Sequence, residues 1–148
     1  MNDTTIRRAS LADLDAIAEI ETLSFTVPWT KDSFTAAFES EYMTLFAAEK
    51  DGQVVGFGCV SVLAPECEIP NIAVHPNERG SGIGGKLFTA MLQYAGEKGA
   101  NTAFLEVRES NIAARSLYEK NGFLPLGIRR NYYTKPTENA IVMQKTPL

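Results

Sequence analysis

A cluster of glycines near the middle of the chain constrains its fold more than any other feature of the sequence. The segment runs from Arg79 to Lys86 and reads R-G-S-G-I-G-G-K. Glycine lets the backbone approach a ligand closely and adopt positive φ. Apolar residues at helical spacing follow directly, at Leu87, Met91 and Ala95. A helix that begins there presents free N–H groups and the positive end of its dipole to an anion. The segment therefore predicts a phosphate-bearing ligand, and the plainer alternative is a flexible turn.

Turn and capping signals divide the rest of the chain into short elements. Asp51-Gly52 lies between two apolar runs, which is a strong hairpin signal. Asn121-Gly122 is a common end for a helix, and Ser10 with Asp13 resembles a capping box in which Asp replaces Glu. In chain order we expect a strand, two helices, three strands, a helix, a strand, a helix and two strands: Thr4–Arg8, Leu11–Ser24, Lys31–Glu39, Thr44–Glu49, Gln53–Leu63, Glu66–Val74, the glycine segment to about Lys98, Thr102–Val107, Asn111 to Asn121, Phe123–Tyr133 and Ala140–Gln144.

This order predicts an α/β (α+β) fold in one domain over residues 1–148. The sheet is expected to be mixed and mostly antiparallel, flanked by about four helices. A chain of this length buries a core without disulfides or metal ions.

Two nucleotide-binding motifs match the glycine segment only in part. Gly80, Gly82 and Gly85 fit G-x-G-x-x-G, and Glu106 lies about 20 residues further on, as a dinucleotide site requires. However, residues 75–79 separate the glycines from the strand, and a hairpin precedes the unit. The Walker A pattern fails because Leu87 stands where a magnesium-binding hydroxyl is needed.

A third pattern, R/Q-x-x-G-x-G/A, fits Arg79 to Gly84 and resembles the pyrophosphate loop of the GNAT acetyltransferase superfamily. The segment N-I-A-V-x-P at Asn71–Pro76 resembles the strand that leads into that loop. Downstream, Asn111-x-x-Ala114-x-x-Leu117-Tyr118-x-x-x-Gly122-Phe123 resembles the last block of the superfamily. Two separate motifs in the right order and spacing are much more specific than one, and they imply the GNAT fold and acetyl-CoA as cosubstrate.

Three further segments resemble the RimI type within this superfamily, the ribosomal-protein-alanine N-acetyltransferases. They are Pro28-Trp29-Thr30, Leu105–Asn111 (L-E-V-R-x-S-N) and Arg129–Tyr133 (R-R-N-Y-Y). The resemblance covers nearly the whole chain. The sequence departs from the family at three places. Arg79 stands where Gln is common, and His75 stands where Asp is frequent. Thr137–Ala140 replaces the usual R-E-D-A. The last change affects the substrate prediction most, since the family binds its peptide near there.

The resemblance assigns the cofactor and acceptor contacts. The backbone N–H groups of the loop are expected to hold the pyrophosphate, the edge of the preceding strand to pair with the pantetheine amides, and the Val74 N–H to serve as an oxyanion donor. Asn111 is expected to contact the cofactor while also capping its helix. The predicted cofactor-binding residues are Ile72, Ala73, Val74, Arg79, Gly80, Ser81, Gly82, Ile83, Gly84 and Asn111, and the predicted acceptor-binding residues are Trp29, Arg130, Asn131, Tyr132 and Tyr133. For the adjacent tyrosines, simple β-packing is an equal alternative.

Glu106 and Tyr118 are the predicted catalytic pair. The attacking amine must be neutral, and an α-amino group has a pKa of roughly 7.7–8.0, so modest help from a base such as Glu106 suffices. That carboxylate needs burial or a bridging water to act, and its plain alternative is a solvated strand-end carboxylate. A phenol with a pKa near 10 can donate a proton to the coenzyme A thiolate, which makes Tyr118 the expected acid. Its alternative is a core tyrosine.

Charge and cysteine content exclude several other classes. The net charge of −4 argues against a nucleic-acid-binding surface. Cys59, Cys67 and the one histidine, His75, form neither a zinc motif nor a disulfide framework, so no metal is expected. The polar start, Met1 to Thr5, does not resemble a signal peptide, and no apolar run reaches the ~20 residues of a membrane span. We therefore expect no membrane association and a cytoplasmic location.

The leading hypothesis is transfer of an acetyl group to a protein N-terminal amine. The resemblance points to the N-terminal alanine of small-subunit ribosomal protein 18 as acceptor. Alternatives are other N-termini, a lysine or a small amine. A different class of function, a non-catalytic acetyl-CoA sensor, would need neither Glu106 nor Tyr118.

Overall fold

A computed structural model describes residues 3–148. Met1 and Asn2, which belong to the predicted domain and to the polar start, lie outside the described residues. The elements follow the predicted order: β1 (Thr4–Arg8), α1 (Leu14–Ser24), α2 (Lys31–Glu39), β2 (Met43–Lys50), β3 (Gln53–Leu63), β4 (Glu66–Val74), α3 (Ile83–Glu97), β5 (Thr102–Arg108), α4 (Ile112–Lys120), β6 (Leu124–Tyr133) and β7 (Glu138–Lys145). Over residues 3–148, no helix combines the length and apolar character that crossing a bilayer requires.

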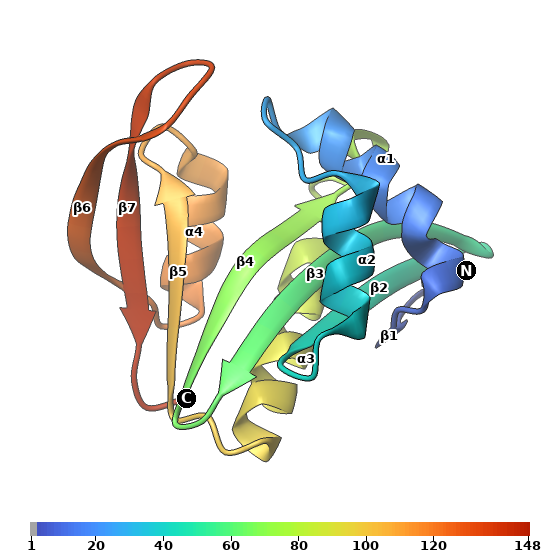
Figure 1. The fold of residues 1–148 in the computed structure, drawn as a ribbon, viewed down its shortest axis with the longest axis horizontal. Coiled ribbons are helices and arrows are strands. Elements are labelled where there is room, and N and C mark those ends of the chain that lie inside the picture. Colours follow the sequence, from blue (N-terminus) through green and yellow to red (C-terminus); the bar gives the residue numbers. More distant parts are fainter. Residues whose placement is uncertain (1–2) are drawn as a thin grey trace.

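The strands form one sheet in the order β1-β2-β3-β4-β5-β7-β6. Among the strands of residues 3–148, only the β4–β5 pair is parallel, so the predicted mostly antiparallel sheet is confirmed. Figure 1 shows α1 and α2 on one face of β2–β4 and α3 on the opposite face. Two apolar cores result, one under α1 and α2 around Phe34 and Phe57, and one under α3 and α4 around Phe88 and Phe123.

Two short 3-10 turns were not predicted. Leu11–Asp13 forms one immediately before α1, and the predicted capping box of Ser10 and Asp13 lies at its start. The Asp13 carboxylate accepts from Ser10 N (2.9 Å) and from both terminal nitrogens of Arg7 (2.9 Å each). The second turn, Pro76–Glu78, lies between β4 and the glycine segment. This turn lies within residues 75–79, which separate the strand from the glycines. That separation was the argument against a dinucleotide-binding motif.

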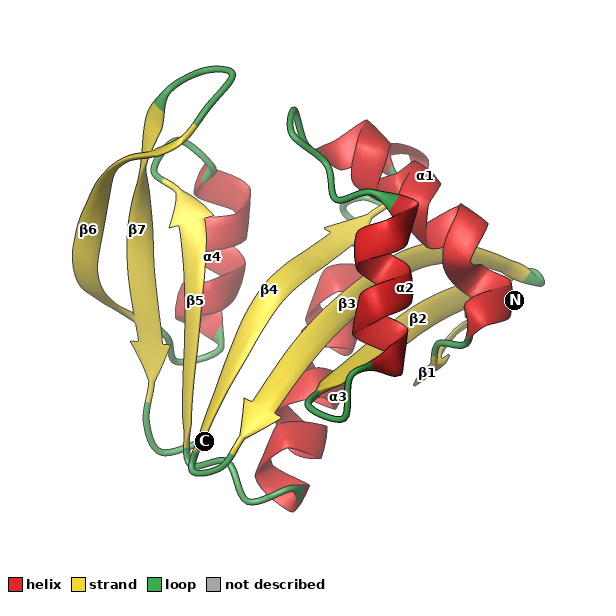
Figure 2. Cartoon of the chain, in the orientation of Figure 1, coloured by secondary structure: helices red, strands yellow, loops and turns green. Residues whose placement is uncertain are grey.

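The sheet splits between β4 and β5, and this split makes the site. The two strands pair only from Glu66 to Glu68 with Thr102 to Phe104. Beyond that point β4 carries an extra residue against β3, and Pro70, which has no N–H to donate, lies in this bulge. Figure 2 shows β4 and β5 meeting at one end and diverging toward the other. The second half of β4 therefore has an edge without a partner strand among the described residues.

Candidate active site

A cleft of about 1030 Å³ opens where β4 and β5 diverge. Its walls come from the end of α1 and the loop after it, the free half of β4, the glycine segment, the end of β5, α4 and the loop between β6 and β7. Most predicted site residues line it: Trp29, Ile72, Ala73, Val74, Arg79, Gly80, Gly82, Ile83, Gly84, Glu106, Asn111, Tyr118, Tyr132 and Tyr133. The lining does not include Ser81, Arg130 or Asn131.

The free edge of β4 presents alternate backbone groups to the cleft. His75 N donates to Val55 O of β3 (2.8 Å), so the backbone groups of Ala73, two residues earlier, also face β3. Those of Ile72 and Val74 point the other way, into the cleft. An extended chain of amides can pair with this edge as an added strand. The prediction of backbone pairing therefore narrows to Ile72 and Val74, while Ala73 packs its side chain in the core under α1.

The glycine segment turns the chain into α3 by way of left-handed backbone. Gly80 and Gly82 both have φ of +84°, and Gly82 is the N-cap of α3. No side chain caps this N-terminus, and no acidic residue lies in its first turn. The first N–H groups of α3 thus have only weak competition for an anion. The Ser81 hydroxyl donates to Glu78 O (2.6 Å), so Ser81 shapes the loop with its side chain.

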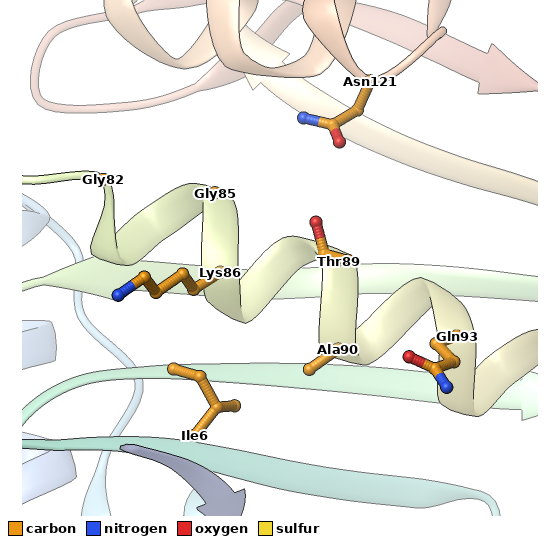
Figure 3. Close-up of a pocket in the computed structure, with 8 residues that line it drawn as sticks. All are labelled: Ile6, Gly82, Gly85, Lys86, Thr89, Ala90, Gln93 and Asn121. Carbon is orange, nitrogen blue, oxygen red and sulfur yellow. The ribbon is translucent and has the colours of Figure 1, made fainter. Parts of the chain in front are cut away.

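A shallower groove of about 520 Å³ continues from the glycine segment along the outer face of α3 (Figure 3). Gly82 and Gly85 stand at its start, and Lys86, Thr89 and Gln93 follow along the helix, with Asn121 on the opposite side. Its one charged group is the Lys86 amine. We place the chemistry in the larger cleft, because the carboxylate and phenol groups lie there.

Glu106 has one oxygen in an ion pair and one without a partner. Oε1 lies 3.6 Å from Arg129 Nε, whereas Oε2 is buried and has no hydrogen-bond partner among the described residues. The side chain is 28% exposed, so the alternative of a fully solvated carboxylate does not apply. This oxygen is therefore open to a hydrogen-bond donor in the cleft.

Tyr118 on α4 is a core residue with its hydroxyl at the cleft. Its ring packs against Phe88 (5.2 Å between centroids) and Phe123 (6.3 Å). No hydrogen bond to the hydroxyl forms within the described part of the chain. Burial, and then the neighbouring Tyr133, raises the pKa of Tyr118, so the phenol stays protonated across the physiological pH range. The ring of Tyr118 therefore packs as a core tyrosine does, and its hydroxyl is still available as a hydrogen-bond donor.

Asn111 caps α4, as the plainer interpretation predicted. Its Oδ1 accepts from Ala114 N (3.1 Å), and the residue also lines the cleft. A contact with the cofactor stays a prediction, and the cap does not preclude it because an amide carries further hydrogen-bonding capacity.

The predicted acceptor-binding segment of β6 divides into two parts. The register shifts between Arg129 and Tyr133, where three residues of β6 oppose Asn139 of β7. Asn131 sits in this bulge at φ of +53°, and its N–H donates to the Asn139 side chain (3.0 Å). The bulge leaves Arg130 and Asn131 outside the cleft lining and places both tyrosines in it. Bulges re-aim side chains in this way.

The two tyrosines and Trp29 contact the catalytic surroundings differently. The Glu106 carboxylate raises the pKa of Tyr132 through a contact looser than an ordinary hydrogen bond. Burial, and then the Glu106 charge, raises the pKa of Tyr133 to about 12. Trp29 packs on Phe34 (5.4 Å between centroids), so much of its ring serves the core. All three offer polar or aromatic surface to an acceptor.

Sequence reasoning missed Glu21, a buried carboxylate in the wall of the cleft. It is 2% exposed and accepts from Asn71 Nδ2 (3.1 Å to each oxygen) and from Trp29 N (3.0 Å). Burial raises the pKa of Glu21 despite these bonds. The signal was present in the sequence, because Glu21 falls on the buried stripe of α1 with Ile17 and Ala18. A carboxylate on such a stripe is rarely accidental.

Comparisons with known proteins agree with this geometry. The model of the acetyltransferase (GNAT) family matches residues 14–123. A Bacillus subtilis protein is 42% identical over 142 residues, covering 95% of this chain and 94% of its own. The [ribosomal protein bS18]-alanine N-acetyltransferase of Haemophilus influenzae is 38% identical over 141 residues, with 93% and 95% covered.

A solved structure gives the same result in three dimensions. The crystal structure of the ribosomal-protein-S18-alanine N-acetyltransferase from Escherichia coli aligns with a TM-score of 0.90 and 34% identity, over 98% of this chain and 94% of that one. The chain therefore belongs to the acetyltransferase (GNAT) family, whose enzymes use acetyl-CoA, and to its RimI-type N-acetyltransferases.

Proposed function

We propose that this N-acetyltransferase acts on the N-terminal α-amine of a protein, with the alanine of small-subunit ribosomal protein bS18 as the preferred acceptor. The relatives with that printed activity match almost the full length of the chain, which supports the same acceptor here. The observation that carries the proposal is the meeting of Glu106, Tyr118 and the free edge of β4 in one cleft. A cofactor sensor would need the edge and the glycine segment alone.

In this proposal acetyl-CoA supplies the thioester, and the chain's own groups position it and move protons. The first N–H groups of α3 and the loop bind the diphosphate, and the backbone of Ile72 pairs with the pantetheine amides. Val74 O accepts from Arg79 Nε (3.0 Å), which leaves the Val74 N–H for the thioester. The Val74 N–H, on the cleft side of β4, donates to the thioester oxygen as charge develops there. Such a donor contributes on the order of 10²–10³ in rate.

Glu106 removes one proton from the amine, directly or through water, and Tyr118 provides one to the departing sulfur, so the protons balance over the reaction. The unpartnered Oε2 supports the first role. The position of Tyr118 in the cleft lining, with a phenol that is protonated at neutral pH, supports the second.

The test is acetyl transfer to matched peptides. Purified protein is incubated with acetyl-CoA and with a peptide that begins with alanine, and free thiol and peptide mass are followed. We expect thiol release with that peptide and none with the same peptide blocked at its N-terminus. A blocked peptide that contains lysine and is acetylated equally well would move the acceptor to lysine. Binding of acetyl-CoA without turnover on any amine would favour a sensor and refute the proposal.

A further inference from the structure

Arg108, the last residue of β5, makes four side-chain hydrogen bonds and stacks on an aromatic ring, although it has no role in the proposed acetyl transfer. Its Nη2 donates to Thr134 O (2.7 Å) and to Thr26 Oγ1 (3.3 Å). Its Nη1 donates to Pro136 O (3.0 Å) and to Glu138 Oε1 (3.3 Å). The guanidinium also lies 4.5 Å from the centre of the Tyr133 ring. A planar fork with five N–H donors can make such a set of contacts, and an ammonium cannot.

These contacts join two loops that stand on opposite sides of the cleft. Thr26 belongs to the loop between α1 and α2, and residues 134–137 form the loop between β6 and β7. In Figure 1 the two loops rise on either side of the diverging ends of β4 and β5. Within residues 3–148, no side chain other than Arg108 hydrogen-bonds to both loops.

We infer that Arg108 is a positioning residue for the acceptor, holding the two loops at the mouth of the cleft at a fixed separation and orienting the Tyr133 ring. This inference rests on the proposed function, because it is the acceptor that must pass between these loops. Three of the polar contacts are to the β6–β7 side and one is to the α1–α2 side, so the bond to Thr26 is the one that spans the mouth. The other three contacts hold Arg108 to the β6–β7 side.

The charges around Arg108 fit a positioning role better than an electrostatic one. Glu138 pairs with the guanidinium, and hydrogen bonding from Ser110, followed by the charge of Arg108 itself, lowers the pKa of Glu138. The carboxylate therefore stays ionised at neutral pH and offsets the cation. Tyr133 faces the guanidinium through its ring, and Glu106 lies two residues earlier on the same face of β5. An incoming amine meets little net positive charge from this pair.

Two variants separate the bridge from the rest of the Arg108 contacts. Thr26→Val keeps the shape of an exposed side chain and removes only the bond across the mouth. Arg108→Lys keeps the charge and removes the fork. Arg115→Lys is the matched control, because Arg115 contacts Glu109 O (2.8 Å) and lies outside the cleft lining.

The measurements are steady-state kinetics with an alanine-starting peptide, acetyl-CoA affinity and hydrogen exchange without substrate. The bond from Arg108 to Thr26 is long (3.3 Å) and exposed, so its loss corresponds to about a 2–10-fold effect, the range of an ordinary hydrogen bond. We expect Thr26→Val to raise the KM for peptide by that factor, with kcat and acetyl-CoA affinity within about twofold. Arg108→Lys should raise KM further, and the control should change nothing. Exchange should speed up in residues 25–30 of Thr26→Val, and in residues 131–137 as well in Arg108→Lys.

Unchanged exchange and KM in both variants would overturn the inference, and a lowered KM would show that the bridge blocks the acceptor instead of positioning it. The exchange experiment needs no acceptor, so it reports on the bridge even where the alanine peptide is not a substrate. A failure of the proposed acceptor is thereby distinguished from a failure of the role of Arg108.

Discussion

Replacing Tyr118 with phenylalanine should separate catalysis from stability in this enzyme. The variant removes the hydroxyl and keeps the ring, which is packed against Phe88 and Phe123. Since no hydrogen bond to that hydroxyl forms within residues 3–148, the free energy of unfolding should change by less than about 1 kcal/mol. A positioned general acid contributes about 10²–10⁴ in rate, so kcat should fall by that factor while acetyl-CoA binding survives.

The matched control for Tyr118→Phe has the opposite pattern. Tyr94 on α3 receives a hydrogen bond from Thr44 Oγ1 (3.0 Å) and lies outside the cleft lining. Tyr94→Phe should therefore lose about 1 kcal/mol of stability with the rate unchanged. Thiol release at saturating acetyl-CoA, calorimetric titration with acetyl-CoA and urea denaturation measure the three quantities. A Tyr118→Phe enzyme within about twofold of the original kcat would remove Tyr118 from the mechanism, whatever its stability.

Changes at four other positions test the loop, the buried carboxylate, the core and an exposed position of α3. Gly84→Glu puts a carboxylate in the first turn of α3, where its Cβ meets only ordinary contacts. In a titration, this variant should bind acetyl-CoA at least about 10-fold more weakly than Gly84→Gln does. Equal losses of affinity in the two variants would mean that no diphosphate is bound there. Because burial raises the pKa of Glu21 above its ordinary 4.5, the folded state keeps that proton to a higher pH than the unfolded chain does. Stability should thus fall as pH rises from 4.5 through the folded pKa, and urea denaturation across that range should show this slope missing in Glu21→Gln. Gly58→Ala would overlap Met91 Sδ and should cost about 1–3 kcal/mol, whereas Gly96→Ala, with open space around it, should stabilise α3 by up to about 1 kcal/mol in the same denaturation assay.

The glycine substitution is placed at Gly84 for a structural reason. Gly82, at the centre of the loop motif, has φ of +84°, so any side chain there strains the backbone even without a ligand. Loss of binding in a Gly82 variant would therefore not distinguish repulsion of the diphosphate from distortion of the loop.

Local sequence patterns were enough to predict the helices and strands and the residues that cap or end each of them. The bounds of β1, α2, β3 and β4 match the sequence prediction, because turns, caps and apolar periodicity are read over a few residues. The start of α1 was wrong by three residues, because Leu11–Asp13 forms a 3-10 turn, which apolar periodicity does not distinguish from the first turn of an α-helix. The start of β7 was placed at Ala140 although Tyr133 pairs with Glu138, because the β6 bulge that sets this register is not visible locally.

The sequence alone determined the family, the glycine loop proposed to bind a diphosphate, and Glu106 and Tyr118 as the proposed catalytic groups, since each depends on residue type and short spacing. The tertiary structure decided what those groups meet. The early end of β4–β5 pairing opens the cleft, and the α1 fold brings Glu21 to Asn71, 50 residues away. The end of β5 brings Arg108 to loops 82 and 26 residues distant. Such contacts depend on how strands pair and diverge, which no window of a few residues contains.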